Sequence, residues 1–194
     1  MPAATTKPRI YAFRALTPER WRDLEQLFGE RGACGGCWCM TWRQTRAEFS
    51  ANKGEKNRKL FRKIVSSGAE PGVIAYDGDT PIGWCAIAPR GEFVVLERSR
   101  TLKRIDDQPV WSVTCFFIIR PYRRRGVSVE LLNAAVEFAK KRGAKIVEGY
   151  PVIATSGSLP DAFAWTGIPA TFLKAGFKEV ARPSRTRPIM RRIL

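Results

Sequence analysis

The sequence contains no histidine. Histidine is the commonest general base near neutral pH and the commonest metal ligand, so any proton transfer here must use a carboxylate, Tyr, Cys, Lys or water. Acidic residues are also scarce, with 18 Asp and Glu against 34 Lys and Arg and a formal net charge of +16. We therefore expect the protein to attract polyanions, such as nucleic acid, an acidic lipid surface or a phosphorylated cofactor.

Long apolar runs are absent as well, since no run approaches the roughly 20 residues that a membrane span requires. Residues 1–8 lack the apolar core of a secretion signal, and five cysteines are an odd number for a disulfide framework. These features predict reduced thiols, no membrane segment and a cytoplasmic location. The length of 194 residues suits one domain spanning 1–194.

Hydrophobic periodicity predicts a chain that mixes strands and helices. The run Val110–Ile119 is rich in β-branched and aromatic residues and is expected to be a central strand. Apolar residues from Val127 to Ala139 then recur at helical spacing before a basic last turn and Gly143. Other expected strands are Arg9–Phe13, the hairpin Val73–Tyr76 with Ile82–Ala88, Gly91–Leu96, Lys145–Val152 and two within Gly176–Leu194. Three other helices are expected: one begins at Pro18, one covers Leu60–Val65 and one covers Pro169–Ala175.

The connection between the central strand and the long helix is rich in arginine. A helix start offers unpaired backbone N–H groups and a favourable dipole to an anion. Glycine lets the backbone approach a phosphate, and guanidinium groups bind phosphate oxygens in pairs. The segment predicts a pyrophosphate site made by Arg123, Arg124, Arg125, Gly126, Val127 and Ser128.

This segment resembles the cofactor motif of the GNAT acetyltransferase superfamily, which reads Arg or Gln, two residues, Gly, one residue, then Gly or Ala. Arg123, Gly126 and Ser128 fill these positions, with Ser128 a small residue that departs from the pattern. The resemblance extends over residues 110–180, where Ala175-Gly176-Phe177 is similar to the Gly-Phe ending of a short family helix. It implies one α/β domain with a mixed, mostly antiparallel sheet of about six or seven strands, splayed between strands four and five and flanked by helices.

In this resemblance, residues 1–70 supply an N-terminal strand and helices with a Cys- and Trp-rich loop, and 71–194 supply the cofactor-binding core and the C-terminal strands. The expected activity is N-acetyltransfer from acetyl-CoA to an amine of unknown identity, without a metal. Backbone groups of Phe117, Ile118 and Ile119 are expected to bind the pantetheine arm. Family members often form homodimers, so a homodimer is suggested, although no sequence feature marks an interface.

The catalytic groups depart from the family pattern. Phe172 stands where many family members have a tyrosine that protonates the leaving thiolate, and a phenyl ring has no proton to give. Glu148 and Tyr150 share one face of the strand Lys145–Val152, where a carboxylate conflicts with the apolar pattern of a buried parallel strand. Glu148 is a candidate base or substrate-positioning group and Tyr150 a candidate donor, whereas an arginine salt bridge and simple packing are the alternatives.

The loop of residues 33–42 carries Cys34, Cys37 and Cys39 at a spacing that could suggest zinc. A closed site would lack a ligand unless a distant cysteine joined it, so we predict no metal. The neighbouring apolar side chains either line the acceptor pocket or pack in the core. They are Trp38, Met40 and Trp42.

Two other functions compete with acetyltransfer. The net charge and a basic C-terminal segment would suit a nucleic-acid-binding or ribosome-associated protein, although the Phe and Trp residues lie mostly in core-like runs. That segment contains Arg182, Arg185, Arg187, Arg191 and Arg192. The second alternative is a CoA-binding module without catalysis, suggested by Phe172.

Overall fold

The computed structural model describes residues 10–155 and 163–194. Its strands form one sheet of seven in the order β1-β2-β3-β4-β5-β7-β6, in which only the β4–β5 pair is parallel. The expected mixed, mostly antiparallel sheet is confirmed. The strands are β1 (Ala12–Ala15), β2 (Gly72–Asp77), β3 (Thr80–Pro89), β4 (Trp111–Ile118), β5 (Ile146–Gly149), β6 (Lys178–Ser184) and β7 (Arg187–Ile193).

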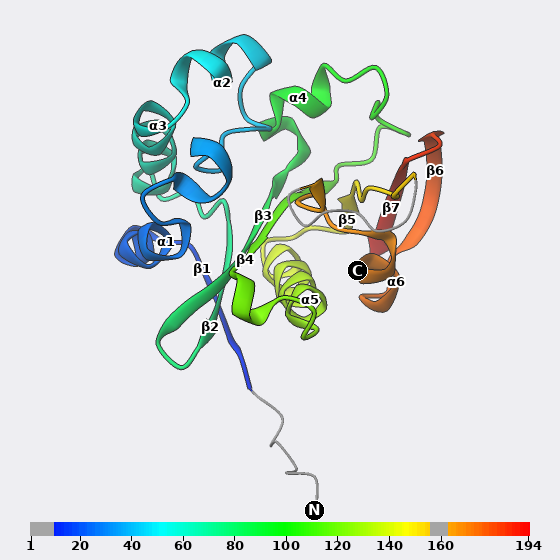
Figure 1. Cartoon of the computed structure of the whole chain (residues 1–194). Coiled ribbons are helices and arrows are strands. Elements are labelled where there is room, and N and C mark those ends of the chain that lie inside the picture. Colours follow the sequence, from blue (N-terminus) through cyan, green and yellow to red (C-terminus); the bar gives the residue numbers. More distant parts are fainter. Residues whose placement is uncertain (1–9, 156–162) are drawn as a thin grey trace, which may run out of the picture.

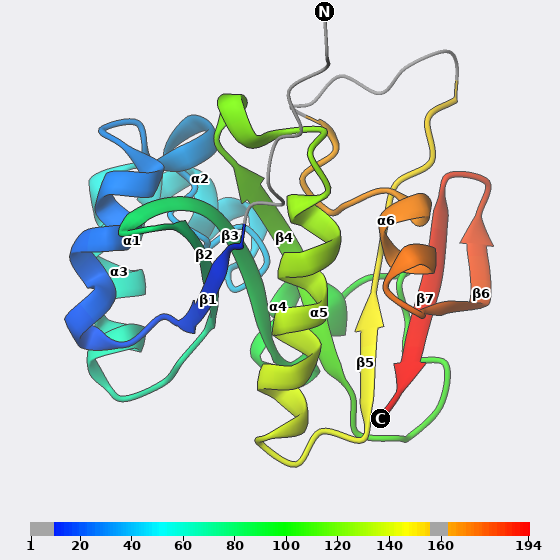
Figure 2. The same ribbon diagram turned by 90° about the horizontal axis from the view of Figure 1, so that it is seen from below.

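Helices cover both faces of this sheet (Figures 1 and 2). The long helix α5 and the short α6 pack on one face, and α1 and α3 pack on the other. A capping box in which Thr45 and Glu48 bond each other's backbone N–H starts α2. The helices are α1 (Trp21–Phe28), α2 (Arg46–Asn52), α3 (Glu55–Ser66), α4 (Val94–Glu97), α5 (Val127–Lys140) and α6 (Pro169–Lys174).

Strand β3 is buried on both faces, and its period of two divides the core. Cys85 and Ile87 pack with α5, whereas Trp84 and Ala86 pack with α1 and α3. A third cluster, which contains Trp42 and Tyr150, fills the space beside α4. The sheet therefore has a hydrophobic layer on each side, and the ends of β4 and β5 lie between these layers.

Three sequence predictions need correction. Gly91–Leu96 forms a turn and the start of α4 rather than a strand, because Phe93 and Leu96, three residues apart, are both buried on one side of a helical turn. The first strand begins later than expected, at Ala12, and Arg9 lies outside the described residues. The strand expected at Lys145–Val152 is β5, which is shorter.

Residues 156–162 of the loop expected between β5 and α6 also lie outside the described part of the chain. The hairpin of β2 and β3 forms as predicted around Gly78, which has a φ of 57°. No helix in the described ranges combines the length and the apolar character that crossing a membrane requires.

The packing of α6 against β5 depends on Gly149. A Cβ at this position would overlap the ring of Phe172, which is fully buried and stacks edge to face on Phe177 at 5.1 Å between centroids. Gly149→Ala is expected to lower the free energy of unfolding by about 1–3 kcal/mol, because a packed core accommodates an added methyl group only with strain. Chemical denaturation measures this change.

Gly91→Ala is the matched control, since a Cβ there meets no atom within 4 Å. Equal stability of the two alanine variants would contradict the packing described for α6.

Candidate active site

The two parallel strands β4 and β5 separate after a short contact. They pair only from Trp111 with Val147 to Val113 with Gly149, and β4 continues to Ile118 paired with β3 but not with β5. Beyond the contact, the N–H of Phe116 donates a hydrogen bond of 2.6 Å to the carbonyl of Trp165, from the segment before α6. The predicted splay between strands four and five is therefore present. It opens along the edge of β4 that faces away from β3.

Only one of the three backbone positions expected to bind pantetheine faces this opening. The N–H of Ile119 donates to the Ile82 carbonyl at 3.1 Å, so the alternating ladder turns Phe117 and Ile119 toward β3. The N–H of Ile118 points the same way as that of Phe116, into the splay. The expectation for Phe117 and Ile119 is thus corrected, because Phe117 pairs with β3, the N–H of Ile119 donates to Ile82, and the Ile119 carbonyl accepts from the N–H of Tyr122 at 3.0 Å.

The arginine-rich turn leads from the splay into α5. Arg123 donates from Nε to the Ile118 carbonyl at 2.8 Å, Arg124 has a φ of 60°, and Gly126 occupies the N-cap with a φ of 83°. No side chain in the described part of the chain caps α5. The first N–H groups of a 14-residue helix are therefore available to an anion.

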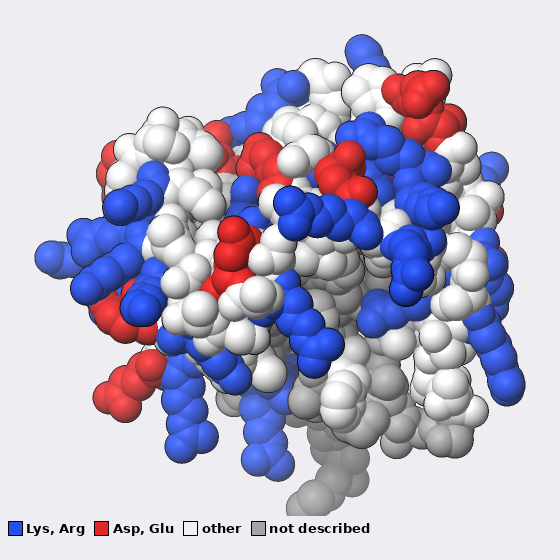
Figure 3. All heavy atoms as spheres, turned by 90° about the horizontal axis from the view of Figure 1, so that it is seen from above, with Lys and Arg blue, Asp and Glu red and all other residues white. Residues whose placement is uncertain are grey.

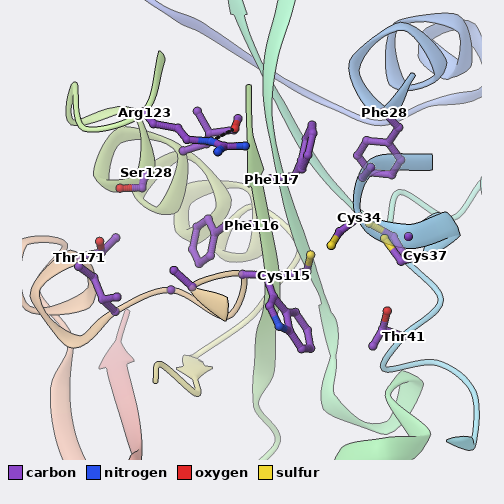
Figure 4. Close-up of a pocket in the computed structure, with 18 of the residues that line it drawn as sticks. Phe28, Cys34, Cys37, Thr41, Cys115, Phe116, Phe117, Arg123, Ser128 and Thr171 are labelled. Carbon is purple, nitrogen blue, oxygen red and sulfur yellow. Dashed lines mark hydrogen bonds between the residues drawn. The ribbon is translucent and has the colours of Figure 1, made fainter. Parts of the chain in front are cut away.

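A cavity of about 640 Å³ connects this turn with the loop that follows α1 (Figure 4). Arg123, Arg124 and Ser128 line one end, and residues 115–118 of β4 cross the middle. Arg125 is exposed outside the lining, and Val127 is buried beneath the turn. The arginine-rich motif and the splay of the two strands thus open into one cavity.

Four cysteines form the wall of the cavity opposite α5. They are Cys34, Cys37 and Cys39 of the loop and Cys115 of β4. Burial, with a smaller effect of Cys115, raises the pKa of Cys37 to about 11, and burial also raises the pKa of Cys39. The thiols of Cys37 and Cys39 are therefore protonated at neutral pH. No three Cys, Asp or Glu side chains among the described residues are arranged to hold a metal ion.

The apolar side chains of the loop lie in the core rather than in the cavity lining. Trp38, Met40 and Trp42 are buried, and the alternating residues Cys39 and Thr41 line the cavity instead. Of the two alternatives for these three side chains, their burial supports packing in the core, because each belongs to a hydrophobic cluster beside the sheet. The Trp38 ring packs at a tilt against Phe28 with 5.8 Å between centroids, and Trp42 stacks on Tyr150 with 6.5 Å between centroids.

Glu148 and Tyr150 belong to a buried network that does not line the cavity. Glu148 accepts from Arg90 at 3.0 Å and from Arg191 at 2.6 Å, and it accepts from the Tyr150 hydroxyl at 2.6 Å. Glu148 and Arg90 are 1% and 2% exposed, and two guanidinium groups surround the buried carboxyl group, as a buried ion pair requires. This geometry favours the salt-bridge interpretation of Glu148 over a catalytic one.

Tyr150 is equally committed to the network. Its hydroxyl accepts from Arg90 at 2.7 Å and lies 2.8 Å from the Ser112 hydroxyl. Burial, followed by the charge of Glu148, raises the pKa of Tyr150 far above the ordinary phenol value. The phenol stays protonated, but it is enclosed and points at Glu148 rather than at a substrate.

Sequence reasoning missed several residues of the cavity. Cys115 and Phe116 belong to the expected central strand, where the pattern indicated burial only. Thr171 precedes Phe172 and lines the cavity, whereas Phe172 is buried against Gly149 and Gly167. The position of Thr171 beside the family's tyrosine position was the one signal that could have identified it.

The protein-family comparison agrees with this architecture. The family described as Acetyltransferase (GNAT) matches residues 38–151, which is more than half of the chain. The protein belongs to the GNAT acetyltransferase family. No curated protein sequence matches it.

Solved structures of this family share the fold. A GNAT acetyltransferase from Streptococcus agalactiae 2603 has a TM-score of 0.57 at 13% identity, with 95% of each chain covered. The PaiA N-acetyltransferase of Thermoplasma acidophilum, in complex with coenzyme A, has a TM-score of 0.51 at 17% identity, with 95% of this chain and 99% of that chain covered. Arabidopsis thaliana NAA60, in complex with acetyl-CoA, has a TM-score of 0.51 at 16% identity, with 95% and 100% covered. At these identities the likeness concerns the fold.

Removing the Glu148 charge tests its structural role. Glu148→Gln is expected to lower the free energy of unfolding by about 3–5 kcal/mol, because Arg90 then loses its buried counter-charge. Thermal or chemical denaturation measures the loss. Glu179→Gln is the control, since it breaks an exposed pair with Arg182 and is expected to change stability little. Unchanged stability of Glu148→Gln would contradict the network.

The protonation of Cys37 is also measurable. Only the thiolate is alkylated, so the rate of iodoacetamide labelling at Cys37 in the folded protein is expected to rise with pH until about pH 11. In denaturant, the same cysteine should level off near its ordinary pKa of about 8.5. Peptide mass spectrometry separates the five cysteines. A folded-state rate that levels off as early as the unfolded one would show that burial does not suppress the thiolate.

Proposed function

We propose that the protein is an acetyl-CoA-dependent N-acetyltransferase. The observation that carries this proposal is the convergence of the splay and the helix start, since the free edge of β4 and the N-terminus of α5 open into the same cavity. A pyrophosphate would lie at the α5 N-terminus beside Arg123 and Arg124. The pantetheine arm would run along β4 and accept a hydrogen bond from the N–H of Ile118.

This placement puts the thioester near Phe116, between α5 and the cysteine wall. The amine would enter from the side of Cys39 and Thr41 and attack the thioester carbonyl, which breaks the carbon–sulfur bond and releases the CoA thiolate. The nitrogen would release a proton to water as the amide forms. Because Phe172 has no proton to donate, the thiolate would receive one from water, directly or relayed through the Thr171 hydroxyl in the cavity lining.

The basic C-terminal segment gives little support to the nucleic-acid alternative. Arg191 pairs with Glu148 and Asp106, and Arg182 pairs with Glu179. Arg187 donates to Thr166, and Arg192 donates to Asn133. Most of these guanidinium groups are therefore committed within the protein, whereas a nucleic-acid surface requires them to be directed outward together.

Calorimetric titration with acetyl-CoA tests the cofactor site. The wild type is expected to bind acetyl-CoA with a Kd in the micromolar range, which corresponds to a binding free energy of about −8 kcal/mol. Gly126→Trp is expected to abolish this binding. The indole would stand over the helix start, where a Cβ meets open space. Gly143→Trp is the matched control, since Gly143 has the same φ of 83° and the same open space beyond the other end of α5.

Retained binding by Gly126→Trp, or absence of binding by the wild type, would overturn the proposed site. If the protein binds acetyl-CoA tightly but acetylates none of the amines tested, the alternative of a CoA-binding module without catalysis is favoured.

A further inference from the structure

A second hollow continues the cavity on the acceptor side. This groove, of about 440 Å³, lies between the start of α2 and α4. It shares Thr41 and Phe49 with the cavity, so the two spaces meet at these side chains. An acceptor whose amine reaches the thioester would therefore extend past Thr41 and Phe49 into the groove.

The groove has an apolar floor with positive charge beside it. Phe49, Val94 and Val95 supply the apolar surface, and Arg46 and Arg98 supply two exposed guanidinium groups. No Asp or Glu is present among the described residues that line the groove or the cavity. Lys53 adds another exposed cation to the acceptor side of the cavity.

The nearest carboxylates are engaged elsewhere. Glu48 is held by the backbone N–H and the hydroxyl of Thr45, whose hydrogen bonds, with a smaller effect of Arg98, lower the pKa of Glu48. Glu92 pairs with Arg43, and Glu97 pairs with Arg90 and Arg104. In the described part of the chain, neither Arg46 nor Arg98 forms an ion pair within 4.0 Å.

The face that carries α2 and α4 is basic as a whole. Figure 3 views the molecule from this side and shows Lys and Arg spread over the surface, with Asp and Glu confined to fewer places between them. A polyamine or an aminoglycoside would meet like charges there, and the lining residues that the structure describes offer no carboxylate to bind its further amines. An anionic group is attracted instead.

We propose that the acceptor is a small amine that carries a carboxylate, joined to the amine by an apolar segment. This inference rests on the proposed acetyltransfer. The amine lies at the thioester, the apolar segment crosses Phe49, and the carboxylate binds Arg46 and Arg98. Because the described residues that line the cavity include no carboxylate, we assign the proton of the acceptor's ammonium form to water, which takes it before the nitrogen attacks the thioester carbonyl.

The test compares amines that share one skeleton and differ in charge. In each series the carboxylated amine is matched with its amide and with the corresponding diamine, for example aminohexanoate, aminohexanamide and diaminohexane, with further series of shorter and branched skeletons. The carboxylated member of at least one series is expected to have a kcat/KM about tenfold or more above that of its amide. The preference is expected to fall as salt is added.

Arginine substitutions locate the carboxylate site. The double variant Arg46→Gln with Arg98→Gln is expected to remove the preference and to leave acetyl-CoA binding, measured by titration, unchanged. Arg185→Gln is the control, since Arg185 is exposed in the turn between β6 and β7. It should leave both quantities as in the wild type.

Several outcomes would overturn the inference. They are a preference for the amide or the diamine in every series, acetylation of no member, and a preference that survives the double substitution. In each of these cases acetyl-CoA binding remains intact, so the proposed cofactor site stands. Loss of acetyl-CoA binding by the wild type would instead remove the proposed function, and the inference with it.

Discussion

The structure depends on how briefly β4 and β5 pair. A parallel ladder that continued to Ile118 would satisfy the backbone of β4 and leave no edge for a ligand. The ladder stops at Val113 and Gly149, and the segment before α6 then approaches Phe116 from the other side. The cavity, the direction of the Ile118 N–H into the splay and the access to the α5 N-terminus all follow from this early separation.

The buried ion network holds the paired ends of the strands on which that separation depends. Glu148 of β5 binds Arg191 of β7, and Arg90 connects Glu148 with the carbonyls of Leu96 and Leu102. A carboxylate so deep in a sheet is stable only when nearby cations compensate the lost hydration. The network thus links the end of β3, the connection before β4 and the C-terminal strand β7 to Glu148 of the short strand β5.

Charge is divided between structural and surface roles. Several arginines that contribute to the net charge of +16 are committed to buried or partly buried carboxylates, as Arg90 and Arg191 are. Others, such as Arg46 and Arg98, remain exposed beside an apolar groove. The composition alone suggested a polyanion partner of any kind, whereas the distribution places positive charge at the arginine-rich turn before α5 and beside the groove between α2 and α4.

The sequence by itself determined the features that depend on neighbours along the chain. The long strand, the arginine turn with Gly126 and the helix α5 follow from local periodicity and backbone freedom, so they could be predicted together with the sheet type and the family. Tertiary structure decided which side chains of the loop face the cavity. Cys39 and Thr41 line it, whereas Trp38 and Trp42, which alternate with them along the chain, are buried in the core. Tertiary structure also chose the partners of Glu148, because Arg90 and Arg191 are distant in sequence and any of many arginines could have filled that role.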